Sequence, residues 1–492
     1  MLHRTTSNNI YKRFLLFSLF ILITILVLRC LETLTVFSHG DALYYHLPFA
    51  KVLAETGSYS NAIRNVCGSL QTGAIEILFS IPALLSVNPL TIQISSQLIH
   101  FSLGMLLAAG LFFYYFSKIN LPIALLSAIS ALTIAKGTDF FLYAKSDGTV
   151  ASFSLLTIML IINDNFLASI KGKWRSIFIG CLLGLIPVIK ISGLFVIVPF
   201  GIYYIIKERR NPSRIFITTF FGLLFISPII IRNYYFIKSP FFPGLLSIFP
   251  GEASEQVRNW YLKSLSSSLT FSSVREILKD FFLGKAFFVL TIPACFYGIK
   301  KKYQSNHIFY ISLSILALYL IANGGVPSER FFFTCYFLNI YYLSQFLIES
   351  KLNIKYQYFI LLLLILADSK IDKSLKRVRN SLFKKYTTNK EMIRDKIPLT
   401  RIWDSIKENN SLILSDQFSQ YHYAPDGTKI HFPQCNNKTE FLFSCKSEND
   451  ILRLKDYDYF ILARSYKNDC YNYIQDNATL IETINQYRIY KK

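Results

Sequence analysis

Long apolar segments separated by short polar connections fill most of the chain. The first covers residues 14–37 and follows three cations within the first thirteen residues. As a helix it would be about 36 Å long, enough to cross the roughly 30 Å hydrocarbon core of a bilayer. A cleaved signal peptide would show small residues at its cleavage site, but Arg29 and Glu32 stand there instead. The segment therefore predicts a membrane span. Its two ions, one helical turn apart, predict an ion pair that either snorkels to the interface or lines a polar site.

Eleven further apolar runs follow the first. They cover about residues 75–87, 92–116, 122–135, 149–162, 176–189, 191–206, 215–231, 286–299, 308–322, 331–348 and 356–367. The run at 75–87 is short and contains Glu76 and Pro82, which favours a helix lying at the membrane interface. The other runs predict an all-α polytopic membrane protein with about 11 transmembrane helices.

The cations between the runs give the predicted orientation. With the N-terminus in the cytoplasm, the cytoplasmic connections contain the basic groups at 171–175, 207–214 and 300–302, whereas the short outer connections contain few cations. This asymmetry follows the positive-inside rule, and counting 75–87 as a span would invert it. We therefore expect an integral protein of the plasma (inner) membrane with a cytoplasmic N-terminus and an extracytoplasmic C-terminal domain.

Composition divides the chain into three predicted parts. Residues 1–367 form the transmembrane domain. Residues 368–402 carry eleven Lys and Arg against four Asp and Glu, with apolar residues at helical spacing, which predicts a basic amphipathic connector. Residues 403–492 are soluble in composition and predict a small extracytoplasmic α/β domain. Its three strand-like runs are 411–415, 458–463 and 487–490.

The overall composition excludes several protein classes. With 52% hydrophobic and 17% charged residues, the chain is too apolar for a disordered protein or a single soluble globule. The net charge of +22 would suit a nucleic-acid binder, but basic cytoplasmic loops in contact with membrane lipids explain it better, so we expect no nucleic-acid partner. No Cys spacing predicts zinc, and Cys435 and Cys445 form either a disulfide or two free thiols.

Polar residues that hydrophobicity does not explain gather at the predicted outer ends of the spans, where functional groups are expected. In the first outer segment Asp41 precedes Tyr45, His46 and a predicted interfacial helix that ends near Gly57. Asp41 is either the N-cap of that helix or a catalytic base at the mouth of a cavity. Tyr45 and His46 are then candidates for binding the substrate.

The second outer segment contains Lys145 and Asp147. Asp147 directly precedes an apolar run, so it is either a helix cap or a second catalytic carboxylate that converges with Asp41. Two such carboxylates would bind a divalent cation or share proton transfer, and we predict no other cofactor. Lys145 is a further candidate for binding the substrate.

Three cations interrupt or border apolar runs. Lys190 lies between two runs, Arg232 closes the run at 215–231, and Arg330 opens the run at 331–348. Each is either an interfacial snorkeller or a ligand for an anionic phosphate headgroup. A phosphate buried without such partners would be very costly, so cations are what a phosphate site requires.

The order of these motifs over roughly residues 10–350 resembles the polytopic glycosyltransferases of the C superfamily. These include the protein O-mannosyltransferases, the lipid A aminoarabinose transferases and bacterial relatives similar to family 39. The matching motifs are Asp41 to Tyr59, Tyr143 to Asp147, Lys190 to Gly193, Arg232-Asn233 and Arg330-Phe331. Two positions depart from the pattern: Ala42 follows Asp41, and Gln71-Thr72-Gly73 stands where the aminoarabinose branch has a Glu-Lys-Pro-like element.

The resemblance implies transfer of a sugar from a polyprenyl-phosphate carrier to a lipid, glycan or protein acceptor at the outer face of the membrane. It implies that Asp41 is the base that orients the acceptor and that Asp147 assists it. The carrier phosphate would be bound by Lys190, Arg232 and Arg330.

Three other functions stay open. A transporter or flippase would usually show internal repeats and broken helices near the middle of the membrane, which we do not find in the sequence. An envelope polymerase or ligase would also use polyprenyl-linked sugars, but as diphosphates. A non-catalytic assembly protein is suggested only by the predicted outer domain.

Overall fold

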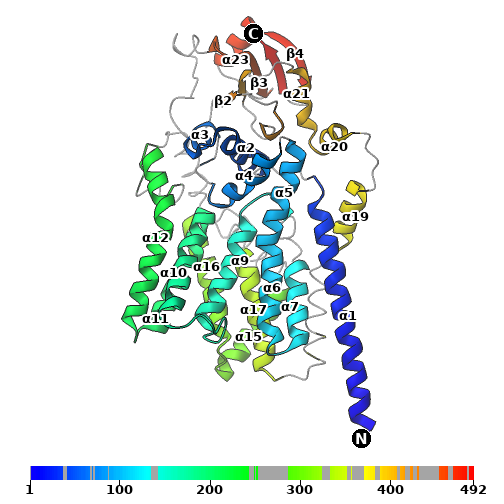
Figure 1. The fold of residues 1–492 in the computed structure, drawn as a ribbon, viewed down its shortest axis with the longest axis vertical. Coiled ribbons are helices and arrows are strands. Elements are labelled where there is room, and N and C mark those ends of the chain that lie inside the picture. The colour runs from blue at the N-terminus through cyan, green and yellow to red at the C-terminus, as the bar shows by residue number, and fades with distance from the viewer. Residues whose placement is uncertain are drawn as a thin grey trace. The chain divides into compact units, whose positions relative to one another are not determined.

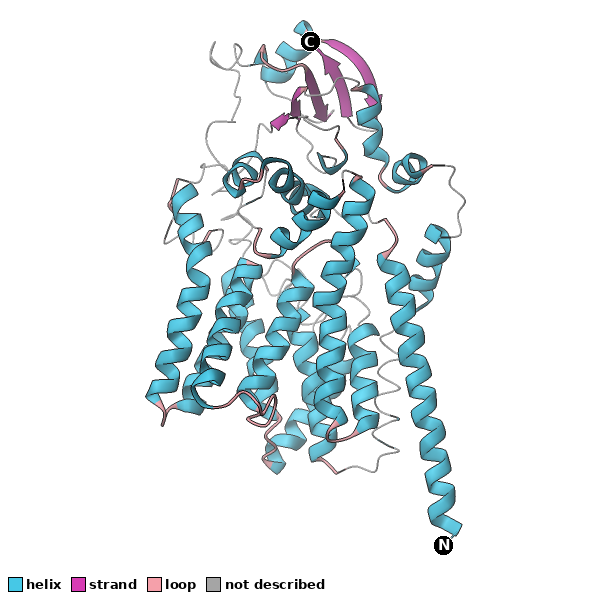
Figure 2. Ribbon diagram, in the orientation of Figure 1, coloured by secondary structure: helices cyan, strands magenta, loops and turns pink. Residues whose placement is uncertain are grey.

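The protein is mainly helical and contains one small sheet (Figures 1 and 2). The computed structural model describes residues 2–36, 42–66, 69, 72–86, 88–133, 142–242, 249, 251–252, 286–323, 333–351, 356, 359, 371–382, 388–406, 411–415, 421–424, 429–431, 454–463, 469–484 and 487–492. Asp41, Asp139, Arg330, Cys435 and Cys445 lie outside the described residues.

Two compact units make up the chain. The first contains residues 1–35, 98–229 and 261–383, and the second contains residues 36–97, 230–260 and 384–492. The expected domain boundaries at 367 and 402 stay a prediction.

The first unit is a helical bundle. Its elements are α1 (Leu2–Thr33), η3 (Ser102–Leu106), α6 (Leu107–Ser117), α7 (Leu121–Thr133), α9 (Asp147–Ile162), α10 (Gly172–Ile189), η4 (Ile191–Gly193), α11 (Leu194–Glu208), α15 (Ala286–Lys301), α16 (Asn306–Asn323), α17 (Phe333–Glu349), α19 (Ile371–Leu382) and most of α12 (Pro212–Ile237). Helix α9 is buried on nearly all its faces and packs against α10 and α17, as expected for a helix that is apolar all round.

Several helices are long and apolar enough to cross a membrane. Among the described residues five segments qualify, namely Leu15–Thr33, Pro89–Ser117, Gly172–Ile189, Ile191–Glu208 and Pro212–Ile237. Such helices mark an integral membrane protein. Shorter apolar helices occupy Leu121–Thr133, Asp147–Ile162 and Asn306–Tyr319. The expected total of about 11 spans stays a prediction, and nearly all of the run at 356–367 lies outside the described residues.

Arg29 and Glu32 form the ion pair that their spacing predicts. The expectation that the pair snorkels to the membrane interface is wrong, because both side chains are buried inside the helical bundle. Arg29 Nη1 lies 2.5 Å from Glu32 Oε2, and both side chains are fully buried. Arg29 also donates to the carbonyl of Leu132, while Glu32 accepts from Arg377 of α19 at 3.0 Å. The pair is buried because it joins three helices, α1, α7 and α19.

In the second unit, the interfacial segment predicted after Asp41 is helical. It consists of the π-helical turn η1 (Ala42–His46), α2 (Leu47–Thr56) and α3 (Tyr59–Asn65). Gly57 ends α2 with a left-handed φ of 61°, which glycine adopts without steric cost. Helix α4 (Ile75–Leu85) packs on α2 and is about 17 Å long, too short to span a bilayer, as its sequence suggests.

The C-terminal part of the second unit contains a five-stranded sheet of order β2-β1-β3-β5-β4. The strands are β1 (Leu412–Ser415), β2 (Lys429–His431), β3 (Tyr459–Ala463), β4 (Thr479–Ile484) and β5 (Tyr487–Lys491). Strands β1, β2 and β3 run parallel, while β5 pairs antiparallel with both β3 and β4. The strands predicted at β1, β3 and β5 are confirmed. The sequence analysis missed β2 and β4.

Helix α23 (Asp469–Asn477) packs on this sheet, and α20 (Asn389–Lys396), η7 (Pro398–Arg401) and α21 (Ile402–Ser405) precede it. The short helix η8 (Tyr421–Tyr423) joins the sheet region to α2 and α5 (Pro89–Phe101). Lys51 Nζ donates to the carbonyl of Ala424 at 2.8 Å, and the buried His422 donates Nε2–H to the carbonyl of Pro89 at 2.8 Å.

Candidate functional site

Asp147 and Lys190 bind each other. Lys190 Nζ lies 2.6 Å from Asp147 Oδ1, and the two side chains are only 7% and 3% exposed. The N-cap of α9 is Ser146, whose side chain makes no capping bond. Asp147 is therefore an ion-pair partner rather than a helix cap, and Lys190 is a buried cation rather than a snorkeller.

A turn separates the two apolar runs on either side of Lys190. Helix α10 ends at Ile189, Lys190 is extended, and the 3-10 turn η4 follows. Gly193 packs against the end of α10, because a Cβ at this position would lie 2.8 Å from the carbonyl oxygen of Ile186. This close approach fixes the turn from which Lys190 reaches Asp147.

His100 of α5 holds the turn that contains Lys145 and Asp147. Its Nδ1 lies 2.5 Å from the carbonyl oxygen of Tyr143, and its Nε2 lies 3.2 Å from the backbone nitrogen of Gly148. These partners assign the tautomer, since Nδ1–H must donate to the carbonyl and Nε2 must accept from the amide. His100 and Lys145 are both fully buried. His100 was not among the residues predicted from the sequence, although a His within the apolar run 92–116 was a signal.

A π-helical turn follows His100 directly. It is η3, and the carbonyl of Gly104 within it accepts a hydrogen bond from the hydroxyl of Ser152 on α9. A π-helical turn leaves carbonyl groups poorly paired within its own helix, and such turns are frequent at functional sites. The turn and His100 together tie the first half of α9 to the segment in which α5 passes through η3 into α6 (Leu107–Ser117).

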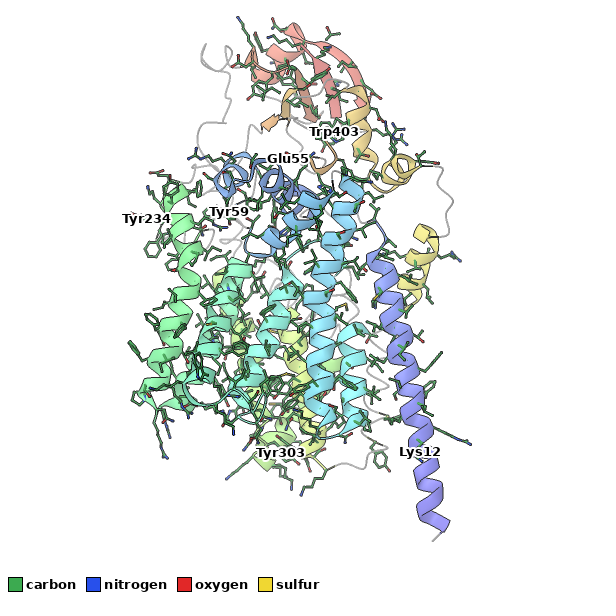
Figure 3. The ribbon with its side chains drawn as sticks, in the orientation of Figure 1. Lys12, Glu55, Tyr59, Tyr234, Tyr303 and Trp403 are labelled. Carbon is green, nitrogen blue, oxygen red and sulfur yellow. The ribbon has the colours of Figure 1, made fainter. Side chains whose placement is uncertain are left out.

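Arg232 is buried in the second unit and is not a snorkeller. Its Nη1 donates to the hydroxyl of Tyr59 at 3.0 Å and to the carbonyl of Thr72 at 2.7 Å (Tyr59 is labelled in Figure 3). Its Nε and Nη2 both donate to Asn233 Oδ1, at 3.0 and 2.8 Å. Asn233 in turn donates to the carbonyl of Phe242 at 3.1 Å. These hydrogen bonds fix the direction of the guanidinium.

His46 and Glu76 form a second buried cluster. His46 Nδ1 is hydrogen-bonded to Glu76 Oε1, and both side chains are fully buried. Glu76 Oε2 accepts from the backbone N–H of Gly73 at 2.6 Å. The ring of Tyr45 lies against His46, with centroids 4.2 Å apart. The sequence analysis did not include Glu76 as a site residue, because its only sequence signal was a charge within a short apolar run.

The arrangement gives no support to the predicted divalent-cation site. Among the described residues, no three His, Cys, Asp or Glu side chains gather as a metal site would require. The carboxylate of Asp147 faces the ammonium of Lys190, which competes with a metal ion for the same oxygen. Asp41 lies outside the described residues, so its predicted convergence with Asp147 stays a prediction.

Comparison with known proteins shows the fold. No protein-family model matches the sequence, and no curated protein matches it. Among solved structures, ArnT from Cupriavidus metallidurans bound to undecaprenyl phosphate superimposes with a TM-score of 0.64 and 10% identity, covering 96% of this chain and 97% of that chain. The apo state of ArnT superimposes with a TM-score of 0.61 and 8% identity, and the shares of the two chains that are covered are the same. An oligosaccharyltransferase from Archaeoglobus fulgidus, in complex with Zn and sulfate, superimposes with a TM-score of 0.49 and 12% identity. The match covers 89% of this chain and 68% of that chain.

The chain therefore has the fold of the polytopic glycosyltransferases of the C superfamily, which its motifs predicted. The match extends through nearly the whole of both chains, so it includes the C-terminal region as well as the helices.

Proposed function

We propose that this protein is a membrane glycosyltransferase that moves a sugar from a polyprenyl-phosphate carrier to an envelope acceptor. The fold it shares with ArnT bound to undecaprenyl phosphate supports this proposal. The observation that carries it is Arg232, a buried guanidinium held in direction by Asn233, Tyr59 and the carbonyl of Thr72. A guanidinium that is fixed in direction suits a phosphate, which it can bind through two parallel hydrogen bonds.

In the proposed reaction an acceptor hydroxyl attacks the anomeric carbon of the sugar. A C–O bond forms there while the bond from the same carbon to the phosphate oxygen breaks, and the electron pair leaves with the polyprenyl phosphate. The hydroxyl proton passes to Asp41, the proposed base. A positioned base contributes about 10²–10⁴ in rate, and one well-placed donor to developing charge contributes about 3–4 kcal/mol.

Other residues keep the roles that their motifs suggested. Lys190 and Arg330 are proposed to attract the carrier phosphate, and Lys145 and Tyr45 the sugar or the acceptor. Asp147 is proposed to assist Asp41 and to fix Lys190 through their ion pair. His46 is proposed to bind substrate through Nε2, since this nitrogen has no hydrogen-bond partner among the described residues.

The topology belongs to the same proposal. It comprises about 11 spans, a cytoplasmic N-terminus, and residues 403–492 on the outer side of the plasma membrane. The positive-inside pattern of the loops supports it, and cysteine labelling from either side of the membrane would test it.

The proposed function is tested with purified protein and polyprenyl-phosphate sugars. The expected result is release of the polyprenyl monophosphate together with a glycosylated acceptor, detected by mass spectrometry. Release of a diphosphate would instead indicate a polymerase or ligase. Uptake of solute or lipid by proteoliposomes without sugar transfer would indicate a transporter.

A further inference from the structure

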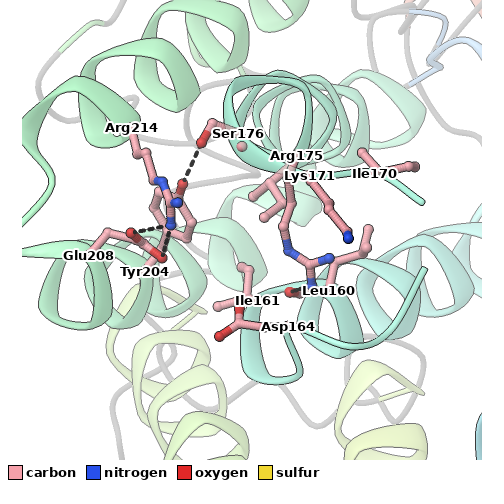
Figure 4. A pocket seen from close by; sticks show the side chains of 12 residues that line it. Leu160, Ile161, Asp164, Ile170, Lys171, Arg175, Ser176, Tyr204, Glu208 and Arg214 are labelled. Carbon is pink, nitrogen blue, oxygen red and sulfur yellow. Dashed lines mark hydrogen bonds and ion pairs between the residues drawn. The ribbon is translucent and has the colours of Figure 1, made fainter. Parts of the chain in front are cut away.

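A cavity of about 320 Å³ lies within the first unit, between the end of α9, the start of α10, the end of α11 and the start of α12 (Figure 4). It belongs to a different region from the Asp147–Lys190 pair. Asp147 begins α9 and the cavity lies at its other end, about 24 Å away along the helix. The proposed chemistry does not use this cavity. Its volume suits a small headgroup, because ligand sites start at about 300 Å³.

Ionic side chains line the cavity, and its carboxylates already have cationic partners. Figure 4 shows Glu208 and Arg214 on one side of it and Arg175 and Lys171 on the other. Glu208 pairs with Arg214 at 3.2 Å, and Asp164 pairs with Lys207 at 2.9 Å. The two remaining cations, Lys171 and Arg175, take no part in these pairs. The charged side chains around the cavity therefore carry a net positive charge.

Arg175 provides a fixed positive charge. Its Nη2 donates to the carbonyls of Leu160 and Asn163, at 2.5 and 2.6 Å, and its Nη1 donates to the carbonyl of Phe166 at 2.9 Å. Carbonyl groups orient a guanidinium without neutralising it. Within the described part of the chain, neither Arg175 nor Lys171 has a carboxylate at ion-pair distance. Lys171 is exposed beside the first residue of α10, so its ammonium is available to a ligand.

Exposed apolar side chains lie on α10 and α12, two helices whose first turns contribute residues to the cavity. Phe216 is 72% exposed, and Phe220 and Leu223 continue the same exposed face of α12 toward its centre. Trp174, next to Arg175, is 73% exposed, and Trp is enriched where hydrocarbon meets headgroups. A free phosphate would use none of this surface, whereas an acyl chain would cover it.

We infer that this cavity binds the phosphate headgroup of an anionic phospholipid. Lys171 and Arg175 attract the phosphate, and the acyl chains cover exposed apolar side chains of α10 and α12 outside the cavity. The positive-inside pattern predicts that the lipid comes from the cytoplasmic leaflet, whose anionic lipids bind basic pockets between transmembrane helices. This inference does not depend on the proposed glycosyl transfer.

The test measures thermal unfolding of the purified full-length protein in detergent with added phosphatidylglycerol, phosphatidylcholine or inorganic phosphate. Phosphatidylglycerol is expected to stabilise the protein more than phosphatidylcholine. Lys171→Gln should raise about fivefold the phosphatidylglycerol concentration that gives half of the maximal stabilisation. This is the change expected when one cation near an anionic lipid is removed. Lys171 is exposed, so the variant should fold normally.

Lys300→Gln is the matched control, because Lys300 is also an exposed cation at a helix end that is predicted to be cytoplasmic. It should leave the response unchanged. Equal weakening by the two substitutions would mean that anionic lipid acts on the general surface charge, and would overturn the inference. So would equal stabilisation by the two lipids, or an inorganic phosphate effect as large as that of phosphatidylglycerol.

Discussion

The ammonium of Lys190 and the carboxylate of Asp147 lie 2.6 Å apart and almost wholly out of contact with solvent. Asp147 is the first residue of α9 and Lys190 directly follows α10, so the two residues are 43 positions apart in the chain. A buried pair of this kind is costly to break by removing one partner, because the other charge is then left without compensation. Each residue therefore constrains the other, whichever of them meets substrate.

Asp147→Asn is expected to lower the free energy of unfolding by about 3–5 kcal/mol. Adding Lys190→Met should recover part of this loss, since neither charge of the pair then remains. Thermal unfolding in detergent measures both variants. Asp164→Asn is the control. Its side chain is 74% exposed, so loss of its pair with Lys207 should change stability by about 1 kcal/mol or less. A double variant as unstable as the sum of its single substitutions would contradict the coupling.

Arg232→Lys is expected to weaken binding of undecaprenyl phosphate by about tenfold or more, because Lys retains the charge but loses the forked hydrogen bonds. Microscale thermophoresis with the detergent-solubilised protein would measure the affinity. Arg209→Lys, at an exposed position, should bind like the unmodified protein. Unchanged affinity in the Arg232 variant would remove it from the proposed phosphate site.

His100→Ala is expected to leave the carbonyl of Tyr143 and the amide of Gly148 buried without their partner. Each orphaned group costs about 1–3 kcal/mol, so unfolding should occur at a clearly lower temperature. If the turn presents Asp147 and Lys145 to substrate, the turnover rate should fall more than the affinity for donor. His307→Ala, at an exposed position on α16, serves as the control. Wild-type stability of the His100 variant would refute the expected role.

Gly193→Ala tests the close approach behind Lys190. The new Cβ would lie 2.7 Å from Ile186 Cγ2 and 2.8 Å from its carbonyl oxygen, so the turn must shift. We expect a loss of about 1–3 kcal/mol in stability, measured by thermal unfolding. Gly201→Ala in α11 meets no atom within 4 Å and should be neutral or stabilising by up to about 1 kcal/mol. Similar effects from the two substitutions would contradict the argument.

His422 predicts a pH dependence. Burial lowers the pKa of its imidazole to about 3, and the neighbouring Lys51 acts in the same direction. The unfolded chain, with an ordinary His pKa of about 6.5, therefore binds this proton first as the pH falls. The neutral ring of His422 therefore makes its full contribution to the free energy of unfolding above about pH 6.5. Between about pH 6.5 and about pH 3 this contribution falls by about 1.4 kcal/mol for each pH unit.

The measurement compares thermal unfolding at about pH 7.5 and about pH 5.5, where the difference from this residue should be about 1.4 kcal/mol. His422→Gln should lose that part of the pH dependence. His307→Gln, at an exposed position, should keep it. Equal pH dependence in the His422 variant and the unmodified protein would show that His422 is not the titrating group.

The sequence predicted those parts of the fold that a local pattern encodes. Apolar runs gave the helices, and alternating or apolar runs gave strands β1, β3 and β5. Strand β4 is exposed over its first five residues, so it lacks the half-buried pattern by which a strand is recognised. The three-residue strand β2 is too short for such a pattern.

The candidate site could be predicted only as a set of residue types. Spacing singled out Asp147, Lys190 and Arg232, but each had an equally ordinary explanation at a helix end. The Asp147–Lys190 pair forms across 43 positions, and Arg232 meets Tyr59 across 173, so their partners depend on tertiary structure. Glu76 and His100 were missed for the same reason, because a single polar residue in an apolar run does not indicate its partner.

The peptide bond between Thr72 and Gly73 has charged partners at both ends. Its carbonyl accepts from the guanidinium of Arg232, and its N–H donates to the carboxylate of Glu76. A half-turn rotation of this one amide plane would break both bonds simultaneously and present each ion with a dipole of the wrong sign. The orientation of the Arg232 guanidinium and that of the Glu76–His46 pair are therefore coupled through a single amide plane of the main chain.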